Sequence, residues 1–309
     1  MPTFKIQHLT QYQYSQYAQY SANRILLYPI QDAFQKVLSH QLIVSTQPQI
    51  SIHKDYYGNE VGTFTVIEPH LTLTIDSIVA IQTYPRQKIE DNIPADVQWK
   101  QLSNPDIVFR YNELLMMDAF SKSKEVQEVF HAMMDATLTP LMLTQKFNQY
   151  VFENFHYVKG ITSVDSTTEE IWQHKSGVCQ DFAHILLSFL RLARIPARYV
   201  SGYICPHQNG MRGEGATHAW VEVYIPEVGW TGVDPTNNCL VNDTHVRLAV
   251  GKHYQDCSPV KGTYRGSPEH HLHVSVSVSY EDGLSLQTQA DIDYITDRQR
   301  EQEFQQAQQ

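Results

Sequence analysis

The 309-residue chain has little positive charge: 23 Lys and Arg residues stand against 33 Asp and Glu, a formal net charge of −10. Phosphate binding requires a basic patch, so this balance argues against nucleic acid as a partner. The sequence has no basic amphipathic run, which argues against a membrane-surface role. No stretch approaches about 18 uninterrupted apolar residues, so no membrane-spanning helix is predicted. The N-terminal segment lacks the short apolar core of a signal peptide, and we expect a soluble, cytoplasmic protein.

Cysteine is scarce, and its spacing excludes several kinds of site. The four cysteines, Cys179, Cys205, Cys239 and Cys257, form no C-x-x-C pair, which excludes zinc ribbons and thioredoxin-like motifs. A chain of this length needs no disulfide framework, so each cysteine is considered singly. No Asp-rich loop of the calcium-binding kind is present. We therefore expect neither a metal nor an organic cofactor.

Hydrophobic residues make up 42% of the chain, enough for a substantial core, and their pattern divides the chain into three parts. Residues 1–100 show β-branched residues in alternation, as in TLTIDSIVAIQ, and the turn signal DYYGN, which predicts an N-terminal antiparallel β domain. Residues 101–285 begin with apolar residues at helical spacing and then mix a buried helix with further strands. Residues 286–309 are rich in Gln and charge, and we expect a solvated helix or a frayed end there.

One of the four cysteines lies at the start of a predicted buried helix. In SGVCQDFAHILLSFLRLARIPARYVSGYI, residues 176–204, the sequence from Gln180 to Ala193 is apolar nearly all round, and Pro196 follows it. Cys179 stands at the first turn, where unpaired N–H groups and the positive end of the helix dipole favour a thiolate. A thiolate is the form that attacks carbonyls. The alternative is a small apolar core residue without chemistry, and position alone leaves the two interpretations balanced.

The segment THAWVEVYIPEVGWTGVDPTNN supplies partners for such a thiolate. His218 begins the first strand of a predicted hairpin and Asp234 ends the second, so both lie at the same end. A thiolate needs a general base, and the base needs an orienting carboxylate on its far nitrogen. A plain four-residue loop, however, puts Asp234 opposite Val221 and on the other face from His218. We therefore predict a bulge or a different loop length near residues 226–229.

Together these motifs resemble a known family. GVCQDFAH, IPARYVSGYI, HAWVEVYIPEVGWTGVDPTNN and LAVGKHYQDCSPVKGTYRG are similar to the transglutaminase-like superfamily of cysteine acyltransferases and peptidases. RILLYP, DYYGNEVGTF and IEPHLTLTI resemble the β domain that precedes the catalytic core in its bacterial two-part branch. The resemblance covers residues 1 to about 285 and implies an α+β fold. In that fold an N-terminal antiparallel β domain precedes a papain-like core, whose Cys-bearing buried helix packs on an antiparallel sheet.

The resemblance also implies roles for individual residues. The family's nucleophile falls on Cys179, its general base on His218 and its orienting acid on Asp234. An oxyanion donor upstream of the nucleophile falls on Tyr157, in FHYV, and a core tyrosine is the alternative for that position. The implied activity is transfer or cleavage of a peptide or protein amide through a Cys thioester, without a cofactor.

Two questions about function stay open at this point. Water as the acyl acceptor would make the protein an amidase or peptidase and an amine would make it a transglutaminase; we favour hydrolysis, since nothing in the sequence suggests an elaborated amine tunnel. The rival from another class is a catalytically silent scaffold of the same fold that binds a partner protein. An arylamine N-acetyltransferase uses the same triad, but its family has helices where this chain shows an N-terminal β domain.

Several other residues near these motifs are expected to be structural. Trp220 is expected to pack beneath the site, and Arg198 to form a structural ion pair, with Asp181 as one candidate partner. His270, His271 and His273 resemble a metal cluster, but they lead into the alternating run HVSVSVSY, and we favour a solvated strand start over a zinc site.

Overall fold

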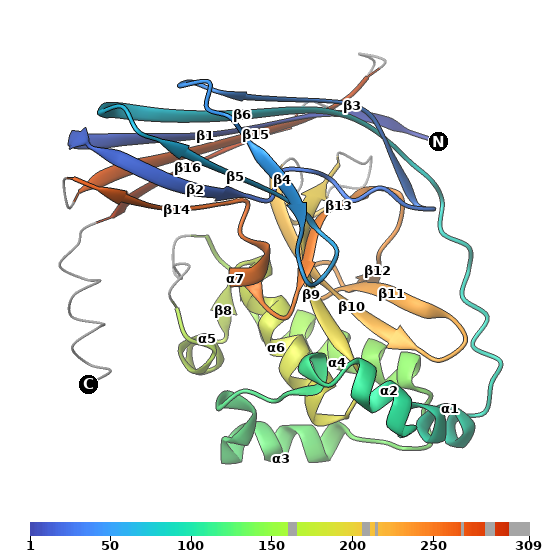
Figure 1. Ribbon diagram of the computed structural model, residues 1–309. Helices are drawn as coiled ribbons and strands as arrows, with labels where there is room; N and C mark the ends of the chain where they lie inside the picture. The colour runs from blue at the N-terminus through green and yellow to red at the C-terminus, as the bar shows by residue number, and fades with distance from the viewer. Residues whose placement is uncertain (160–165, 206–210, 214–215, 267–268, 282–287, 297–309) are drawn as a thin grey trace.

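The computed structural model describes residues 1–159, 166–205, 211–213, 216–266, 269–281 and 288–296 (Figure 1). These residues form a β region of two sheets and, below it in Figure 1, a third sheet packed with helices. No helix in this part of the chain is long and apolar enough to cross a membrane.

The β region takes strands from both ends of the chain, and all neighbouring strands are antiparallel. Its five-stranded sheet has the order β16 (Thr288–Thr296), β15 (His270–Tyr280), β1 (Thr3–Ala18), β6 (His70–Thr83) and β3 (Gln35–Val44). Its four-stranded sheet has the order β14 (Val260–Arg265), β2 (Tyr20–Ile25), β5 (Glu60–Val66) and β4 (Ser51–Lys54).

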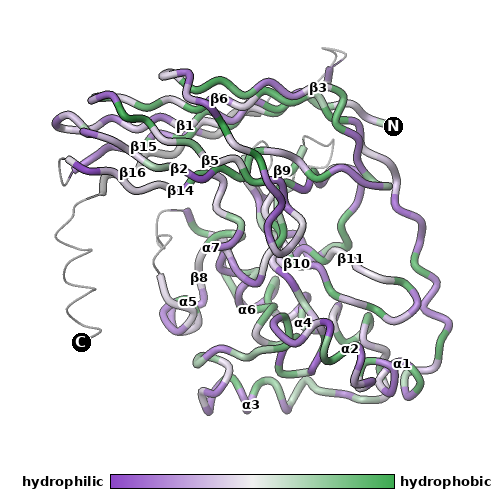
Figure 2. The backbone as a smooth tube through the Cα atoms, viewed as in Figure 1, coloured by the Kyte–Doolittle hydropathy of each residue, from purple (hydrophilic) through white to green (hydrophobic). Residues whose placement is uncertain are grey.

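Alternating sequence explains why these strands bury one face. Along β6 every second residue from Leu73 to Thr83 is buried, as the alternation of TLTIDSIVAIQ predicts. Figure 2 shows the same alternation of apolar and polar residues along several of these strands. The predicted turn DYYGN joins β4 to β5: Asp55 Oδ1 accepts hydrogen bonds from the backbone N–H groups of Tyr57 and Asn59, and Gly58 supplies a φ of +85°.

The core is a sheet with a buried helix against it. The sheet has the order β12 (Cys239–Leu240), β11 (Gly229–Asp234), β10 (Thr217–Ile225), β9 (Ala197–Ile204) and β13 (His245–Gly251). Helix α6 (Cys179–Leu192) packs against β10 and β9, and its residues Phe182, Ile185 and Phe189 are fully buried. The apolar run after Cys179 therefore forms the predicted central helix.

Further helices cover the face of α6 away from the sheet, and α4 packs directly on it (Figure 1). Ser123 and Thr139 begin two of them, each accepting a hydrogen bond from a first-turn N–H. The remaining elements are α1 (Ala95–Leu102), α2 (Pro105–Arg110), η1 (Glu113–Leu115), η2 (Phe120–Lys122), α3 (Lys124–Met133), α4 (Pro140–Asn154), β7 (His156–Tyr157), α5 (Thr168–His174), β8 (Ser176–Gly177) and α7 (Tyr254–Cys257).

A buried charge network ties the β region to the core sheet. Glu222, on β10, is fully buried and accepts from Arg198 Nη2 at 2.7 Å and from Arg247 Nη1 at 3.1 Å. Arg247 also pairs with Asp32 of the β region. Arg198 is thus in an ion pair, as expected, but with Glu222, its cross-strand neighbour, rather than with Asp181.

The structure confirms the expected α+β fold class, an antiparallel β region and a core in which a buried helix that begins at Cys179 packs on an antiparallel sheet. One expectation about its C-terminal end is wrong. Residues 288–296 are neither a solvated helix nor a frayed end, because they pair with β15 as an edge strand. Since β14, β15 and β16 complete the sheets begun by β1 and β2, the chain returns to the β region after the core. The division at residues 100 and 285 stays a prediction.

Candidate active site

The β10–β11 hairpin resolves the register problem posed by the sequence. Ile225 pairs with Gly229 and Val221 with Val233, so the loop is one residue shorter than the plain one. Glu227, in this loop, takes a φ of +63°. The shift puts Asp234 opposite Trp220 instead of Val221, on the face that carries His218. The predicted change of loop length is therefore confirmed.

His218 and Asp234 are in direct contact. His218 Nε2 lies 3.0 Å from Asp234 Oδ2, and both side chains are fully buried. Asp234 Oδ1 accepts from the backbone N–H groups of Thr236 at 2.8 Å and Asn237 at 3.3 Å, and the Asn237 amide donates to Oδ2 at 2.8 Å. Burial alone would raise the pKa of Asp234, but His218 and the hydrogen bonds it receives hold that pKa well below its usual range.

The contact with Asp234 decides how His218 carries its proton. An ionised carboxylate only accepts, so His218 Nε2 carries one hydrogen and Nδ1 is the nitrogen that takes up or releases the second proton. Nδ1 is buried and has no hydrogen-bond partner among the described residues. Burial lowers the pKa of His218, but the charges of Asp234 and Cys179 outweigh burial and raise it. Cys179 is thus close enough to act on the imidazole electrostatically.

Cys179 is the first residue of α6 and is partly exposed. Asp181, in the first turn, accepts from the Val178 N–H at 2.7 Å and so closes the start of the helix. A Cβ on Gly177 would lie 2.4 Å from Asp181 Oδ2, which explains the glycine. The Asp181 carboxylate is therefore engaged with backbone at the helix start.

Tyr157 lies beside the cysteine. It is on β7, whose parallel pairing with β8 places Tyr157 opposite Gly177, two residues before Cys179. The ring meets Phe182 edge-on at 6.2 Å. Burial, followed by the charges of Cys179 and Asp234, raises the pKa of its hydroxyl, so Tyr157 keeps its proton and can donate a hydrogen bond.

Trp220 packs beneath the imidazole, as expected. It is fully buried and stacks on His218 with ring centroids 6.2 Å apart and planes at 28°. From the other side, Gly213 covers His218 with a φ of +81°, and a Cβ there would lie 2.8 Å from His218 Nδ1. Asn237 holds this segment, accepting from the Arg212 N–H at 2.8 Å and donating to the Arg212 carbonyl at 3.2 Å.

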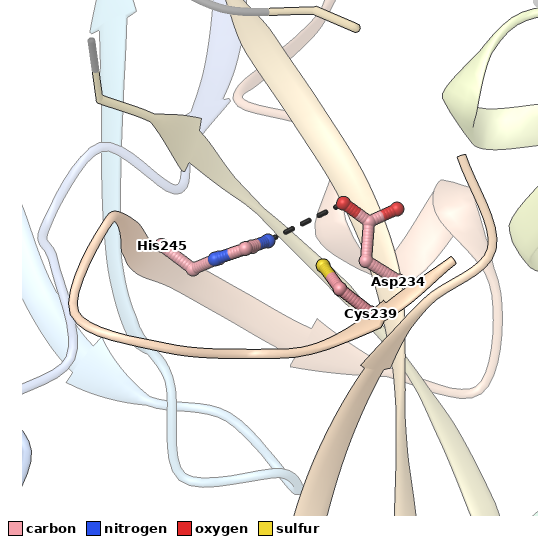
Figure 3. Close-up of side chains that lie close together, drawn as sticks. All are labelled: Asp234, Cys239 and His245. Carbon is pink, nitrogen blue, oxygen red and sulfur yellow. Dashed lines mark hydrogen bonds and ion pairs between the residues drawn. The ribbon is translucent and has the colours of Figure 1, made fainter. Parts of the chain in front are cut away.

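Sequence reasoning missed one residue of this network. His245, the first residue of β13, directs Nε2 at Asp234 Oδ2 from 3.3 Å, and its side chain is fully buried (Figure 3). Two imidazoles therefore share one carboxylate oxygen. No linear signal marks His245, because β13 is brought near Asp234 only by the successive pairing of β13 with β9, β9 with β10 and β10 with β11.

Three residues around Asp234 are of the types that bind metal ions. Ligand atoms of Asp234, Cys239 and His245 lie within 4.8 Å of one another (Figure 3). The acid and the imidazole are already hydrogen-bonded to each other, and burial, then the Asp234 charge, raises the pKa of the Cys239 thiol to about 12. Asp234 and His245 thus form a hydrogen-bonded pair, and the Cys239 thiol lies beside that pair.

The structure does not gather the three other candidate histidines into a ligand set within the described residues. His270 contacts the Tyr264 hydroxyl at 3.2 Å, and His273 lies 4.0 Å from Asp291. His270, His271 and His273 occupy the start of β15, the strand that the alternating sequence predicts.

The site combines a cysteine at the start of α6 with a hydrogen-bonded imidazole and carboxylate on the antiparallel sheet against which that helix packs. Two family models match the chain: the transglutaminase-like superfamily over residues 128–235 and the bacterial transglutaminase-like N-terminal region over residues 4–82. The chain belongs to the transglutaminase-like superfamily.

Two relatives and one solved structure are similar to this chain. An uncharacterized protein of Mycobacterium tuberculosis (strain ATCC 25618 / H37Rv) is 30% identical over 299 residues, covering 92% of this chain and 94% of the relative. A protein-glutamine gamma-glutamyltransferase of Pseudomonas aeruginosa is 31% identical over 163 residues, 50% of this chain and 22% of that protein. A candidate cysteine protease from Cytophaga hutchinsonii shares the fold, with a TM-score of 0.67 and 18% identity over 94% of this chain and 98% of its own.

Proposed function

We propose that the protein is a cysteine-dependent acyl-transfer enzyme acting on a peptide or protein amide. Cys179 is its nucleophile, His218 its general acid and base, and Asp234 its orienting acid. The observation that carries the proposal is the His218–Asp234 contact at 3.0 Å, which leaves His218 Nδ1 buried and unbonded among the described residues, next to Cys179.

In the first half-reaction the Cys179 thiolate attacks the amide carbonyl. The sulfur–carbon bond forms, the carbon–nitrogen bond breaks, and His218 gives its Nδ1 proton to the departing nitrogen. A thioester and a free amine or ammonia result. Donors that meet the oxyanion would be the Cys179 N–H and the Tyr157 hydroxyl, the latter kept protonated by burial.

In the second half-reaction neutral His218 takes a proton from the acceptor at Nδ1. The acceptor oxygen or nitrogen bonds to the acyl carbon, the carbon–sulfur bond breaks, and the thiolate is restored with an imidazolium beside it. Asp234 stabilises that cation and holds the ring, while Trp220 supports it from below. No metal or organic cofactor takes part in either half-reaction.

Hydrolysis is the outcome that we favour, in a cytoplasmic setting. The likeness to the gamma-glutamyltransferase of Pseudomonas aeruginosa favours a second candidate, transfer of a glutamine acyl group to an amine. A glutamine-containing peptide, incubated with and without an added primary amine, separates the two. Glutamate in both samples indicates hydrolysis, whereas a γ-glutamyl amide that appears only with amine indicates transfer.

The central test is alkylation by iodoacetamide, followed by mass spectrometry of each cysteine. We expect selective labelling of Cys179 at neutral pH that is lost in the His218→Ala variant. Cys205 and Cys257 are the internal controls, because both are buried and burial raises the pKa of Cys257 well above its usual range. Equal labelling of Cys179 and these cysteines would support the silent-scaffold alternative.

A further inference from the structure

A second histidine is built into the site through Asp234. His245 Nε2 lies 3.3 Å from Asp234 Oδ2, the same oxygen that takes the His218 hydrogen bond. The ring centroids of His218 and His245 are 6.4 Å apart, and Trp220 contacts both: it stacks on His218 and meets His245 at nearly a right angle, with centroids 5.3 Å apart. The two imidazoles are therefore packed as one unit around a single carboxylate.

Hydrogen bonding fixes which nitrogen of His245 serves Asp234. Facing an ionised carboxylate, Nε2 must carry hydrogen, while Nδ1 lies 3.3 Å from Thr244 Oγ1, 3.3 Å from Asn242 Oδ1 and 3.5 Å from the Asn242 N–H. Burial lowers the pKa of His245, the charges of His218 and the nearby Arg86 lower it further, and Asp234 only partly opposes them. His245 is therefore a neutral donor while His218 is the ring that becomes cationic.

Asp234 does not depend on His245 for its position. Backbone N–H groups of Thr236 and Asn237 hold Oδ1, and the Asn237 amide holds Oδ2. What His245 adds is a second imidazole N–H on the oxygen that faces His218. A donor on that oxygen stabilises the carboxylate and reduces its pull on the His218 proton, because both compete for the same lone pairs.

Resting on the function proposed above, we propose that His245 is a positioning residue that acts through Asp234. It shares the charge of this carboxylate with His218, and so leaves His218 able to give up its proton and serve as the base of the second half-reaction. The groups around the pair are Cys179 on α6, Tyr157 on β7, Cys239 on β12 and Arg86 after β6. Of these, only Cys179 acts directly on the His218 ring.

The first readout is the pH profile of Cys179 alkylation by iodoacetate. The reagent carries a negative charge that an imidazolium attracts, so the rate falls at alkaline pH when His218 loses its proton. In His245→Leu the Asp234 carboxylate loses a hydrogen-bond donor and interacts more strongly with His218, which raises the pKa of His218. We therefore expect the rate of alkylation to fall at a pH about 0.5 to 1 unit higher than in the wild type. His245→Gln keeps an N–H donor and should restore the wild-type profile.

The second readout separates the half-reactions with p-nitrophenyl acetate, an activated ester. Thiolate attack releases p-nitrophenolate in a burst, and hydrolysis of the acetyl thioester then sets the steady rate. His245→Leu should keep the burst rate but lower the steady rate at pH 7 by roughly 3- to 10-fold, the factor that corresponds to the pKa shift. Raising the pH should recover the steady rate. His53→Leu, a change at an exposed histidine of β4, is the matched control.

The outcomes distinguish this proposal from the function on which it rests. If wild-type Cys179 is not selectively alkylated, the proposed function fails. If the wild type reacts but alkylation of His245→Leu slows at the same pH as in the wild type or at a lower one, the charge-sharing role of His245 is overturned and the proposed function stands. Should His245→Leu not fold, nitrogen NMR of the wild type decides: His245 must remain a neutral Nε2–H tautomer while His218 titrates, and a cationic or Nδ1–H His245 overturns the proposal.

Discussion

His218 Nε2 lies 3.0 Å from Asp234 Oδ2, and neither side chain is exposed to solvent. A buried carboxylate and a buried imidazole in this contact stabilise each other's charge, which is why the pKa of Asp234 is lowered and that of His218 is raised. The contact also selects the His218 tautomer that leaves Nδ1 free toward Cys179. Much of the expected behaviour of the site follows from this one pair.

Asp234→Asn removes the charge but keeps the shape. Because the carboxylate raises the pKa of His218, its loss should lower that pKa and move the alkaline fall of iodoacetate alkylation to lower pH by about one unit or more. The direction is opposite to that expected for His245→Leu. We also expect turnover of an amide substrate to fall by roughly 100-fold or more, since the base loses its orienting acid. An unchanged profile would contradict the assigned role of Asp234.

Gly213→Ala should obstruct the His218 imidazole without removing any polar group from the site. The added Cβ would lie 2.8 Å from His218 Nδ1, the nitrogen assigned to the thiol proton. We expect alkylation of Cys179 at neutral pH to fall by at least about 10-fold, since His218 must shift away from its partner.

The control for Gly213→Ala is Gly58→Ala. Gly58 has a nearly equal φ, +85° against +81°, and nothing lies within 4 Å of its ideal Cβ. Both changes strain the backbone by about 1–2 kcal/mol and should lower the thermal midpoint, and the close approach to His218 adds to the loss in Gly213→Ala. Only Gly213→Ala should slow alkylation. Equal alkylation rates in the two variants would show that Gly213 has only a backbone role.

The sequence predicts the helix and strands that carry this site better than it predicts how they connect and pair. The local pattern is enough to place Cys179 at the start of a buried helix, because a long apolar run bounded by Gly177 and Pro196 permits little else. The hairpin of His218 and Asp234 is equally local. The length of the hairpin loop could not be predicted locally, since Glu227 adopts a left-handed φ that is usual for glycine or asparagine.

Long-range pairing accounts for what sequence reasoning missed. His245 on β13 reaches Asp234 on β11 across two intervening strands, β9 and β10, and nothing in HVRLAVG distinguishes a site histidine from a strand start. The C-terminal return is of the same kind: β15 pairs with β1, more than two hundred residues away in sequence, and β16 pairs with β15. Such partners depend on which sheet edge is open after the core has formed, and that is a property of the whole fold.

Acid stability should depend on His8, a buried residue of β1. Its Nδ1 lies 3.0 Å from the Tyr203 hydroxyl, and burial lowers its pKa to about 4. The unfolded chain binds this proton below about pH 6.5 and the folded chain only below about 4, so folding stability must fall between these values as the pH drops. We expect His8→Gln to remove of order 3 kcal/mol of this pH dependence, measured as urea unfolding free energy at pH 7.5 and 4.5. Exposed His53→Gln is the control, and an equal dependence in both variants would contradict the prediction.

Tyr157→Phe separates an oxyanion donor from a packing tyrosine, because alkylation and acyl transfer differ in one respect. Displacement of iodide by the Cys179 thiolate forms no oxyanion, whereas attack on a carbonyl does. If the Tyr157 hydroxyl stabilises that oxyanion, its removal should leave the rate and pH profile of Cys179 alkylation unchanged while lowering the p-nitrophenyl acetate burst rate by roughly 100-fold. A tyrosine that only packs against Phe182 keeps its ring in this variant, so both rates should then remain at the wild-type level. Loss of both rates together would instead mean that the hydroxyl supports the cysteine itself.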